Sequence, residues 1–207
     1  MSRDAPYRIV TERTVVRCWE PRDAPLVKDA IDSSVDELRR WMPWALNEPQ
    51  TLEQKVQLLR EFRGQFDLGE AFVYGLFSPD ESEVVGGSGL HKRVGADAFE
   101  IGYWIRTSRA GQGLATEVTA ALTRVGFEAC EVDRIEIQCE PANERSMRIP
   151  RKLGYTEEAR LRRRLYAPPG GEPRDVVVFS MFRADYPGTP ASSAALEAYD
   201  AAGTRVL

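Results

Sequence analysis

The stretch that decides the fold reads Arg109-Ala110-Gly111-Gln112-Gly113-Leu114-Ala115-Thr116-Glu117. It is a glycine-rich turn with a strand-like run over 99–105 before it and an amphipathic segment over 118–129 after it. A strand, a glycine turn and a helix start in this order leave main-chain N–H groups unpaired beside the positive end of a helix dipole. Such a place binds phosphate or pyrophosphate, so the sequence predicts a phosphorylated ligand.

Two familiar phosphate-binding turns fit this stretch less well. A P-loop requires Lys and Ser or Thr after its last glycine, whereas Leu114 follows Gly113. A dinucleotide fingerprint requires Gly or Ala at the position where this chain has Thr116, and hairpin-like strands rather than βαβ units precede the turn. A nicotinamide-dependent enzyme is therefore disfavoured and is kept as an alternative.

The turn resembles the pyrophosphate-binding signature of the GNAT superfamily of N-acetyltransferases, Gln/Arg-x-x-Gly-x-Gly/Ala. Gly113 and Ala115 match its last two positions, while Ala110 stands where the family has Gln or Arg. The resemblance implies that acetyl-CoA is bound as a co-substrate, through main-chain amides and without a metal. The residues it assigns to this ligand are Ile105, Arg109, Ala110, Gly111, Gln112, Gly113, Leu114, Ala115, Thr116, Asn143 and Ser146.

A second stretch, 143–155, looks like a later helix of the same family, in which Asn is followed three residues on by Ser and the end reads Lys-Leu-Gly-Tyr. Asn143 is a good helix N-cap and Gly154 a good helix stop. Pro150 inside this helix is expected to kink it or to cost a hydrogen bond.

The front of the chain, around 11–24 and 38–44, resembles the subgroup of this family that acetylates protein N-termini, the ribosomal-protein alanine type. The whole resemblance covers about residues 8–185, which we predict to be one acyl-CoA N-acyltransferase domain. Residues 186–207 are rich in Ala, Ser, Gly and Thr, and predict a weakly ordered tail.

The periodicity predicts an α+β domain of mostly antiparallel strands with helices between them. The family resemblance implies a mixed, strongly twisted sheet, in which the strand before the glycine turn and the strand over 134–139 splay apart. Further strands are expected over 13–19, 71–77, 83–92, 156–166 and 175–183, and further helices over 21–32, 51–66 and 143–153. Residues 38–44 are expected to form a short helix or a loop.

Transfer of an acyl group to an amine requires a base, because amines are largely protonated at neutral pH. Glu158 is the first candidate, by the resemblance, and Glu100, at the start of the strand with Gly102 and Tyr103, is the second; either could instead be a strand residue paired with arginine. Ser146 is the candidate donor to the leaving thiolate, with Tyr155 as an alternative. Trp41 and Trp44 form either an aromatic plug or a wall of the acceptor site.

Composition limits the remaining function classes. The net charge is −4, which argues against general nucleic-acid binding. The three cysteines and the single histidine, His91, form no metal-binding pattern. No apolar run is long enough to span a membrane and residues 1–4 do not start a signal peptide, so a cytoplasmic protein is expected.

The leading hypothesis is an N-acetyltransferase that moves an acetyl group from acetyl-CoA to a primary amine by direct attack in a ternary complex. A CoA-binding sensor or interaction protein without turnover is the alternative from another class. A longer donor such as succinyl-CoA stays open, and the arginines at 160, 162, 163 and 164 would be relevant to it. The amine acceptor is left open between a protein N-terminus and a small amine, and a homodimer is a family expectation.

Overall fold

The computed structural model describes residues 5–165 and 172–207. Its helices in chain order are α1 (Ala24–Asp32), α2 (Val35–Trp41), α3 (Leu52–Asp67), α4 (Leu114–Glu128) and α5 (Glu144–Leu153). Four 3-10 turns accompany them: η1 (Pro21–Asp23), η2 (Pro43–Asn47), η3 (Thr107–Arg109) and η4 (Pro190–Ser193). The strands are β1 (Arg8–Val10), β2 (Val15–Cys18), β3 (Phe72–Phe77), β4 (Val84–His91), β5 (Ala98–Ile105), β6 (Arg134–Cys139), β7 (Thr156–Leu165), β8 (Arg174–Phe182) and β9 (Glu197–Tyr199).

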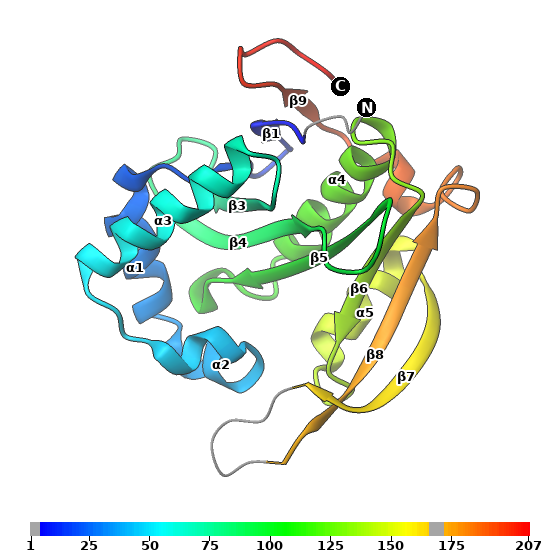
Figure 1. Cartoon of the computed structure of the whole chain (residues 1–207), viewed down its shortest axis with the longest axis horizontal. Coiled ribbons are helices and arrows are strands. Elements are labelled where there is room, and N and C mark those ends of the chain that lie inside the picture. The colour runs from blue at the N-terminus through cyan, green and yellow to red at the C-terminus, as the bar shows by residue number, and fades with distance from the viewer. Residues whose placement is uncertain (1–4, 166–171) are drawn as a thin grey trace.

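The described strands form one mixed sheet in the order β7-β8-β6-β5-β4-β3-β2-β1-β9. Its described pairs are antiparallel except for β5 with β6, which run parallel. The expected α+β architecture is therefore confirmed. Figure 1 shows α1, α2 and α3 on one side of the sheet, and α4 and α5 on the other.

Local sequence explains where the helices begin and end. Thr51 and Gln54 form the capping box predicted for α3, each side chain bonding to the other residue's main-chain N–H. The side chain of Asn143 caps α5 by accepting from the N–H of Ser146 at 3.1 Å. Gly154 ends α5 in the left-handed conformation. These caps fix the start of α5, which carries a candidate site residue.

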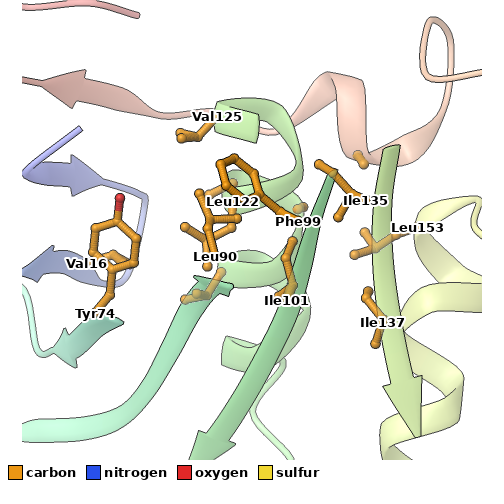
Figure 2. Close-up of a cluster of buried hydrophobic side chains, with 14 of the residues drawn as sticks. Val16, Tyr74, Leu90, Phe99, Ile101, Leu122, Val125, Ile135, Ile137 and Leu153 are labelled. Carbon is orange, nitrogen blue, oxygen red and sulfur yellow. The ribbon is translucent and has the colours of Figure 1, made fainter. Parts of the chain in front are cut away.

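Two apolar clusters lie on opposite faces of the sheet. The larger cluster packs α4 and α5 against β1 to β6, β8 and β9. Part of it is drawn in Figure 2, with Leu122 from α4 and Leu153 from α5 beside the strands. The smaller cluster packs α1, α2 and α3 against β2 to β4 and includes Trp19 and Phe77. Alternating strand residues supply the two faces, as expected for a sheet covered on both sides.

The end of the chain differs from the expected weakly ordered tail. Strand β9 pairs with β1, and η4 contacts α4. Ala191 and Ala198 are fully buried. At these two positions the small side chain lets the backbone lie close to its neighbours, and the strand pairing orders the segment despite its composition. The last residue of the strand expected over 156–166, and residues 1–4, lie outside the described residues.

Candidate active site

The glycine turn joins β5 to α4 and presents a row of free main-chain donors. Gly111 and Gly113 have φ angles of 78° and 83°, a region that favours glycine, and Gly113 is the N-cap of α4. Within the described part of the chain, the amides of residues 111–116 donate to no other group. The turn therefore has the free N–H groups that an anion-binding site at a helix N-terminus requires.

The turn between β1 and β2 braces the glycine turn from outside. Glu117, in the first turn of α4, accepts hydrogen bonds from the Thr11 hydroxyl at 2.7 Å and from the main-chain N–H of Arg13 at 2.9 Å. The Arg13 guanidinium binds Glu117 at 2.6 Å and the carbonyl of Gln112 at 2.7 Å. Sequence reasoning missed this brace, because the two turns lie about a hundred residues apart in the chain.

Arg109, predicted to help bind the ligand, lies just before the glycine turn. Its exposed guanidinium forms an ion pair with Glu83, the residue that precedes β4. The same carboxylate lies 3.4 Å from Arg106, which also binds Asp29 at 2.8 Å. Acidic partners thus already hold the cationic groups at this end of β5, and the main-chain amides remain as the free donors.

Strands β5 and β6 part within the sheet. They pair only over Ala98–Glu100 and Arg134–Glu136. Beyond these residues β5 pairs with β4 alone and β6 with β8 alone. Figure 2 shows the two strands running apart from the level of Phe99 and Ile135 towards Ile101 and Ile137. This β5–β6 divergence confirms the predicted splaying, and it leads towards the glycine turn at the end of β5.

Ser146 joins the two diverging strands on the α5 side. Its Oγ lies 3.0 Å from the Tyr103 hydroxyl of β5 and 3.2 Å from the Cys139 Sγ of β6. The Tyr103 hydroxyl also donates to the Ser146 carbonyl oxygen at 3.1 Å. The predicted Ser146 therefore lies at the divergence, in contact with two residues that sequence reasoning had not assigned to the site.

Tyr103 and Cys139 both remain protonated here. Burial raises the pKa of the Tyr103 phenol well above its ordinary value and also raises the pKa of the Cys139 thiol. Tyr155, the alternative to Ser146, is buried elsewhere and pairs with Thr123 of α4 at 2.6 Å. Tyr155 is thus a packing residue, whereas Tyr103 is the tyrosine beside Ser146.

The two candidate bases lie in one line across the face of the sheet that is opposite to α4 and α5. Register pairs run from His91 to Glu100, from Glu100 to Glu136, and from Glu136 to Ser180. Ser180 then donates to Glu158 of β7 at 2.5 Å. We call these five residues the polar row. It crosses the sheet at Glu100 and Glu136, the last pair before the divergence.

The two carboxylates of this row differ in their partners. Glu100 is 8% exposed, and Arg93 binds both of its oxygens, at 2.8 and 2.6 Å. Glu158 is exposed, and only its Oε2 accepts a hydrogen bond from another described residue. Arg93 thus occupies both oxygens of Glu100, whereas one oxygen of Glu158 has no partner among the described residues, so the geometry favours Glu158 over Glu100 as a base.

His91 lies flat against the sheet at one end of the polar row. A Cβ at Gly89 would meet the imidazole Nε2 at 2.7 Å, so a larger residue there would require the His91 side chain to move. Burial, followed by the nearby Arg93, lowers the pKa of His91, while Glu100 acts in the opposite direction. The imidazole is therefore neutral at physiological pH.

One of the two predicted tryptophans reaches this face. Trp44, on η2, is 38% exposed and meets Trp104 of β5 edge-on, with ring centroids 6.0 Å apart. Trp41 is half-buried and donates to Glu37 on its own helix at 3.3 Å. Trp44 is therefore partly exposed beside β5 and does not form a buried aromatic plug.

The described residues contain no cluster of acidic, histidine and cysteine side chains that could hold a metal ion. They also contain no helix with the length and apolar character needed to cross a membrane.

Comparisons with known proteins agree with this geometry. The family model described as "Acetyltransferase (GNAT) domain" matches residues 13–156. The [ribosomal protein uS5]-alanine N-acetyltransferase of Escherichia coli is 31% identical, over 73% of this chain and 79% of that protein. YdaF of Bacillus subtilis is 28% identical, over 86% of this chain and 96% of its own length. The structure of Mycobacterium smegmatis RimJ in complex with CoA-disulfide has the same fold, with a TM-score of 0.76, 24% identity and 90% of each chain covered.

Proposed function

The chain belongs to the acetyltransferase (GNAT) family and is an N-acetyltransferase, and we propose that it transfers the acetyl group of acetyl-CoA to the α-amino group of a protein. The observation that carries this proposal is the β5–β6 divergence, which has free amides of the glycine turn at the end of β5 and Ser146 between its strands. A long thioester with a diphosphate matches this combination of two diverging strands and an anion site.

The amides of residues 111–116 would hold the pyrophosphate of acetyl-CoA. They are unpaired in the described residues and point from the N-terminus of α4, where the helix dipole favours negative charge. The pantetheine arm would follow the divergence from there, past Ile105 at the end of β5. Asn143 would act indirectly, by capping the helix that carries Ser146.

Glu158 would take the proton from the attacking ammonium group. Its Oε1 is free of described partners, while Ser180 donates to Oε2 and holds the carboxylate in place. Glu100 is the second candidate, and its bidentate contact with Arg93 weakens that assignment. A positioned carboxylate typically contributes a factor of about 10² to 10⁴ in rate.

The reaction would then proceed by direct attack. The base takes one proton from the ammonium, and the neutral nitrogen attacks the thioester carbon. When the intermediate collapses, the C–S bond breaks and its electron pair goes to sulfur. The second proton lost by nitrogen leaves with the CoA thiol, so the products are an amide, CoA and the protonated base. Ser146 would stabilise the departing sulfur by donating a hydrogen bond.

A protein N-terminus is the acceptor class that the site supports best. The face that holds the polar row also carries the partly exposed Trp44 beside Trp104, a wall suited to an extended peptide. The E. coli relative, 31% identical, is named for the alanine of a ribosomal protein. A cytoplasmic location and a homodimer remain predictions that accompany this proposal.

A longer acyl donor such as succinyl-CoA is the second candidate. Arg162 and Arg164 on β7 have no carboxylate partner among the described residues, in contrast to Arg160, which pairs with Asp175 at 3.4 Å. Free guanidinium groups could bind the distal carboxylate of a succinyl group.

The test measures release of free CoA thiol from acetyl-CoA and from succinyl-CoA, with short peptides and small amines as acceptors. We expect acetyl-CoA with a peptide N-terminus to give the highest rate. Tight CoA binding with background thiol release for every acceptor would instead support a CoA-binding sensor. Stabilisation by NAD but not by CoA would support the nicotinamide alternative.

The base assignment is tested in the same assay with Glu158→Gln and Glu100→Gln. We expect Glu158→Gln to lower kcat by about 10² or more with CoA affinity retained, since a carboxamide cannot take the proton. Full activity of Glu158→Gln from about pH 6 to about pH 9, which brackets the α-amino pKa of about 8, would contradict the assignment. A larger loss in Glu100→Gln would transfer the role to Glu100.

A further inference from the structure

Helix α5 contains a proline where a regular helix requires a hydrogen-bond donor. Pro150 lies within Glu144–Leu153 and has no main-chain N–H. In an α-helix the N–H of a residue bonds to the carbonyl four residues earlier, which here is the carbonyl of Ser146. Pro150 therefore leaves the Ser146 carbonyl without its usual donor.

Tyr103 supplies the missing donor from the sheet. Its hydroxyl lies 3.1 Å from the Ser146 carbonyl oxygen and 3.0 Å from the Ser146 Oγ. Leaving a partly buried carbonyl oxygen without a hydrogen-bond donor lowers the stability of the folded state, so a hydrogen bond from the phenol to this carbonyl is favourable. The proline in α5 and the tyrosine in β5 thus act on the same residue.

A count of protons fixes the direction of the hydrogen bonds. The phenol has a single proton, and a carbonyl can only accept. When the Tyr103 proton goes to the Ser146 carbonyl, the phenol oxygen is left as an acceptor, and Ser146 becomes the donor in the Ser146–Tyr103 pair. The Cys139 thiol, 3.2 Å away, can donate to the Ser146 Oγ from the other strand.

We propose that Pro150 and Tyr103 are positioning residues that make Ser146 a hydrogen-bond donor towards the sulfur that leaves at the β5–β6 divergence. Pro150 leaves the carbonyl free, and Tyr103 donates to it. The Ser146 hydroxyl then holds its own proton on the Tyr103 oxygen until the thiolate forms. The charged sulfur is the stronger acceptor, so the Ser146 proton turns from the phenol oxygen to the sulfur. The inference rests on the proposed function, in which Ser146 stabilises that sulfur. Neither Pro150 nor Tyr103 exchanges a proton with the substrate.

Pro150→Ala and Pro150→Gly test this inference because both restore the main-chain N–H. Each should lower kcat about five-fold, the factor equivalent to one hydrogen bond with a net worth of about 1 kcal/mol, with KM for acetyl-CoA unchanged. Thermal stability should move the other way, because proline is the least favourable helix residue; Pro150→Ala should raise Tm, and more so than Pro150→Gly. A loss of activity together with a gain in stability is not expected of a purely structural proline.

Tyr103→Phe removes only the hydroxyl and tests the coupling. It should lower kcat by at least the same factor, and Pro150→Ala should have no further effect in the Tyr103→Phe background. Arg148→Ala, an exposed change on the same helix, is the matched control and should leave kcat unchanged. The proline variants keep the test decisive if Tyr103→Phe folds poorly.

Wild-type kcat in both proline variants, or additive effects in the double variant, would overturn the inference. Activity of the unchanged protein in the same assay separates this failure from failure of the proposed function. Absence of thiol release by the wild type with every acceptor would remove the proposed function itself. An active wild type together with unchanged kcat in both proline variants would contradict only the roles proposed for Pro150 and Tyr103.

Discussion

The guanidinium of Arg13 binds the carboxylate of Glu117 at 2.6 Å and, through a second nitrogen, the carbonyl of Gln112 inside the glycine turn. The hairpin turn at the front of the chain is thereby joined to the first turn of α4. The amides that would receive the pyrophosphate are held by this contact from outside, because nothing within the turn itself bonds to them among the described residues.

Glu117→Ala should therefore weaken CoA binding. The carboxylate accepts hydrogen bonds from Thr11 and Arg13, and their loss frees the turn. We expect Kd for CoA, measured by calorimetry, to rise about ten-fold, the equivalent of roughly 1.4 kcal/mol. Glu61→Ala, an exposed change on α3, is the control. An unchanged Kd in Glu117→Ala would show that the turn keeps its shape without the brace.

Gly113→Ala should destabilise the protein and weaken CoA binding together. The φ angle of Gly113 is 83°, which costs a residue with a Cβ about 1–2 kcal/mol. Gly64→Ala is the matched control, because Gly64 lies inside α3 with open space around its would-be side chain. That change should stabilise the protein by about 0.5–1 kcal/mol and leave CoA binding alone. Chemical denaturation and calorimetry measure both, and equal effects of the two changes would contradict the role of the turn.

The buried pair of Lys55 and Glu48 should be essential for stability. Their side chains are 0% and 2% exposed, and the pair fastens the segment that carries Trp44 to α3. Lys55→Met leaves the buried Glu48 carboxylate without its counter-ion, with only the main-chain N–H of Gln50 bonded to it, and should cost about 3–5 kcal/mol in urea unfolding. The double change Lys55→Met with Glu48→Gln should recover part of this loss. Arg40→Met, which breaks an exposed pair with Glu37, should cost at most about 1 kcal/mol.

Stability should fall as the pH drops below the ordinary histidine pKa of about 6.5. Burial lowers the pKa of His91 in the folded protein, so the folded state binds fewer protons than the unfolded chain just below that pH. The stability contributed by neutral His91 therefore rises with pH and is fully present above about pH 6.5. His91 is the only histidine, so His91→Gln should flatten this part of a Tm series from about pH 7.5 to about pH 5. An unaltered slope would mean that other groups cause it.

Short-range signals made much of the fold predictable. The glycine turn, the Thr51 capping box and the Asn143 cap each depend on a few neighbouring residues, and all three lie where the sequence placed them. The short strands β1 and β9 escaped prediction, because three residues carry too little periodicity and their pairing joins the two ends of the chain.

The site was predictable only in part, since contacts between distant segments depend on strand register. Ser146 could be named from its helix, but its contact with Tyr103 spans 43 residues and follows from how α5 lies against β5. Glu100 and Glu158 could be named separately, whereas their place in a single row depends on the pairing of four strands. A one-residue shift in any of these pairs would have moved one carboxylate to the other face.

The short parallel pairing between β5 and β6 also bears on how the molecule resists heat. Among the described residues, three register pairs and the main-chain bonds from Asp133 and Arg134 to the Asp97 carbonyl form the hydrogen-bonded seam between two parts of the sheet. One part contains β6, β8 and β7, and the other runs from β5 through β4, β3, β2 and β1 to β9. A ligand bound at the divergence next to this seam would contact both parts of the sheet and stabilise their association. Calorimetric scans of the empty protein should accordingly show a broader, less cooperative melting peak than scans at saturating CoA.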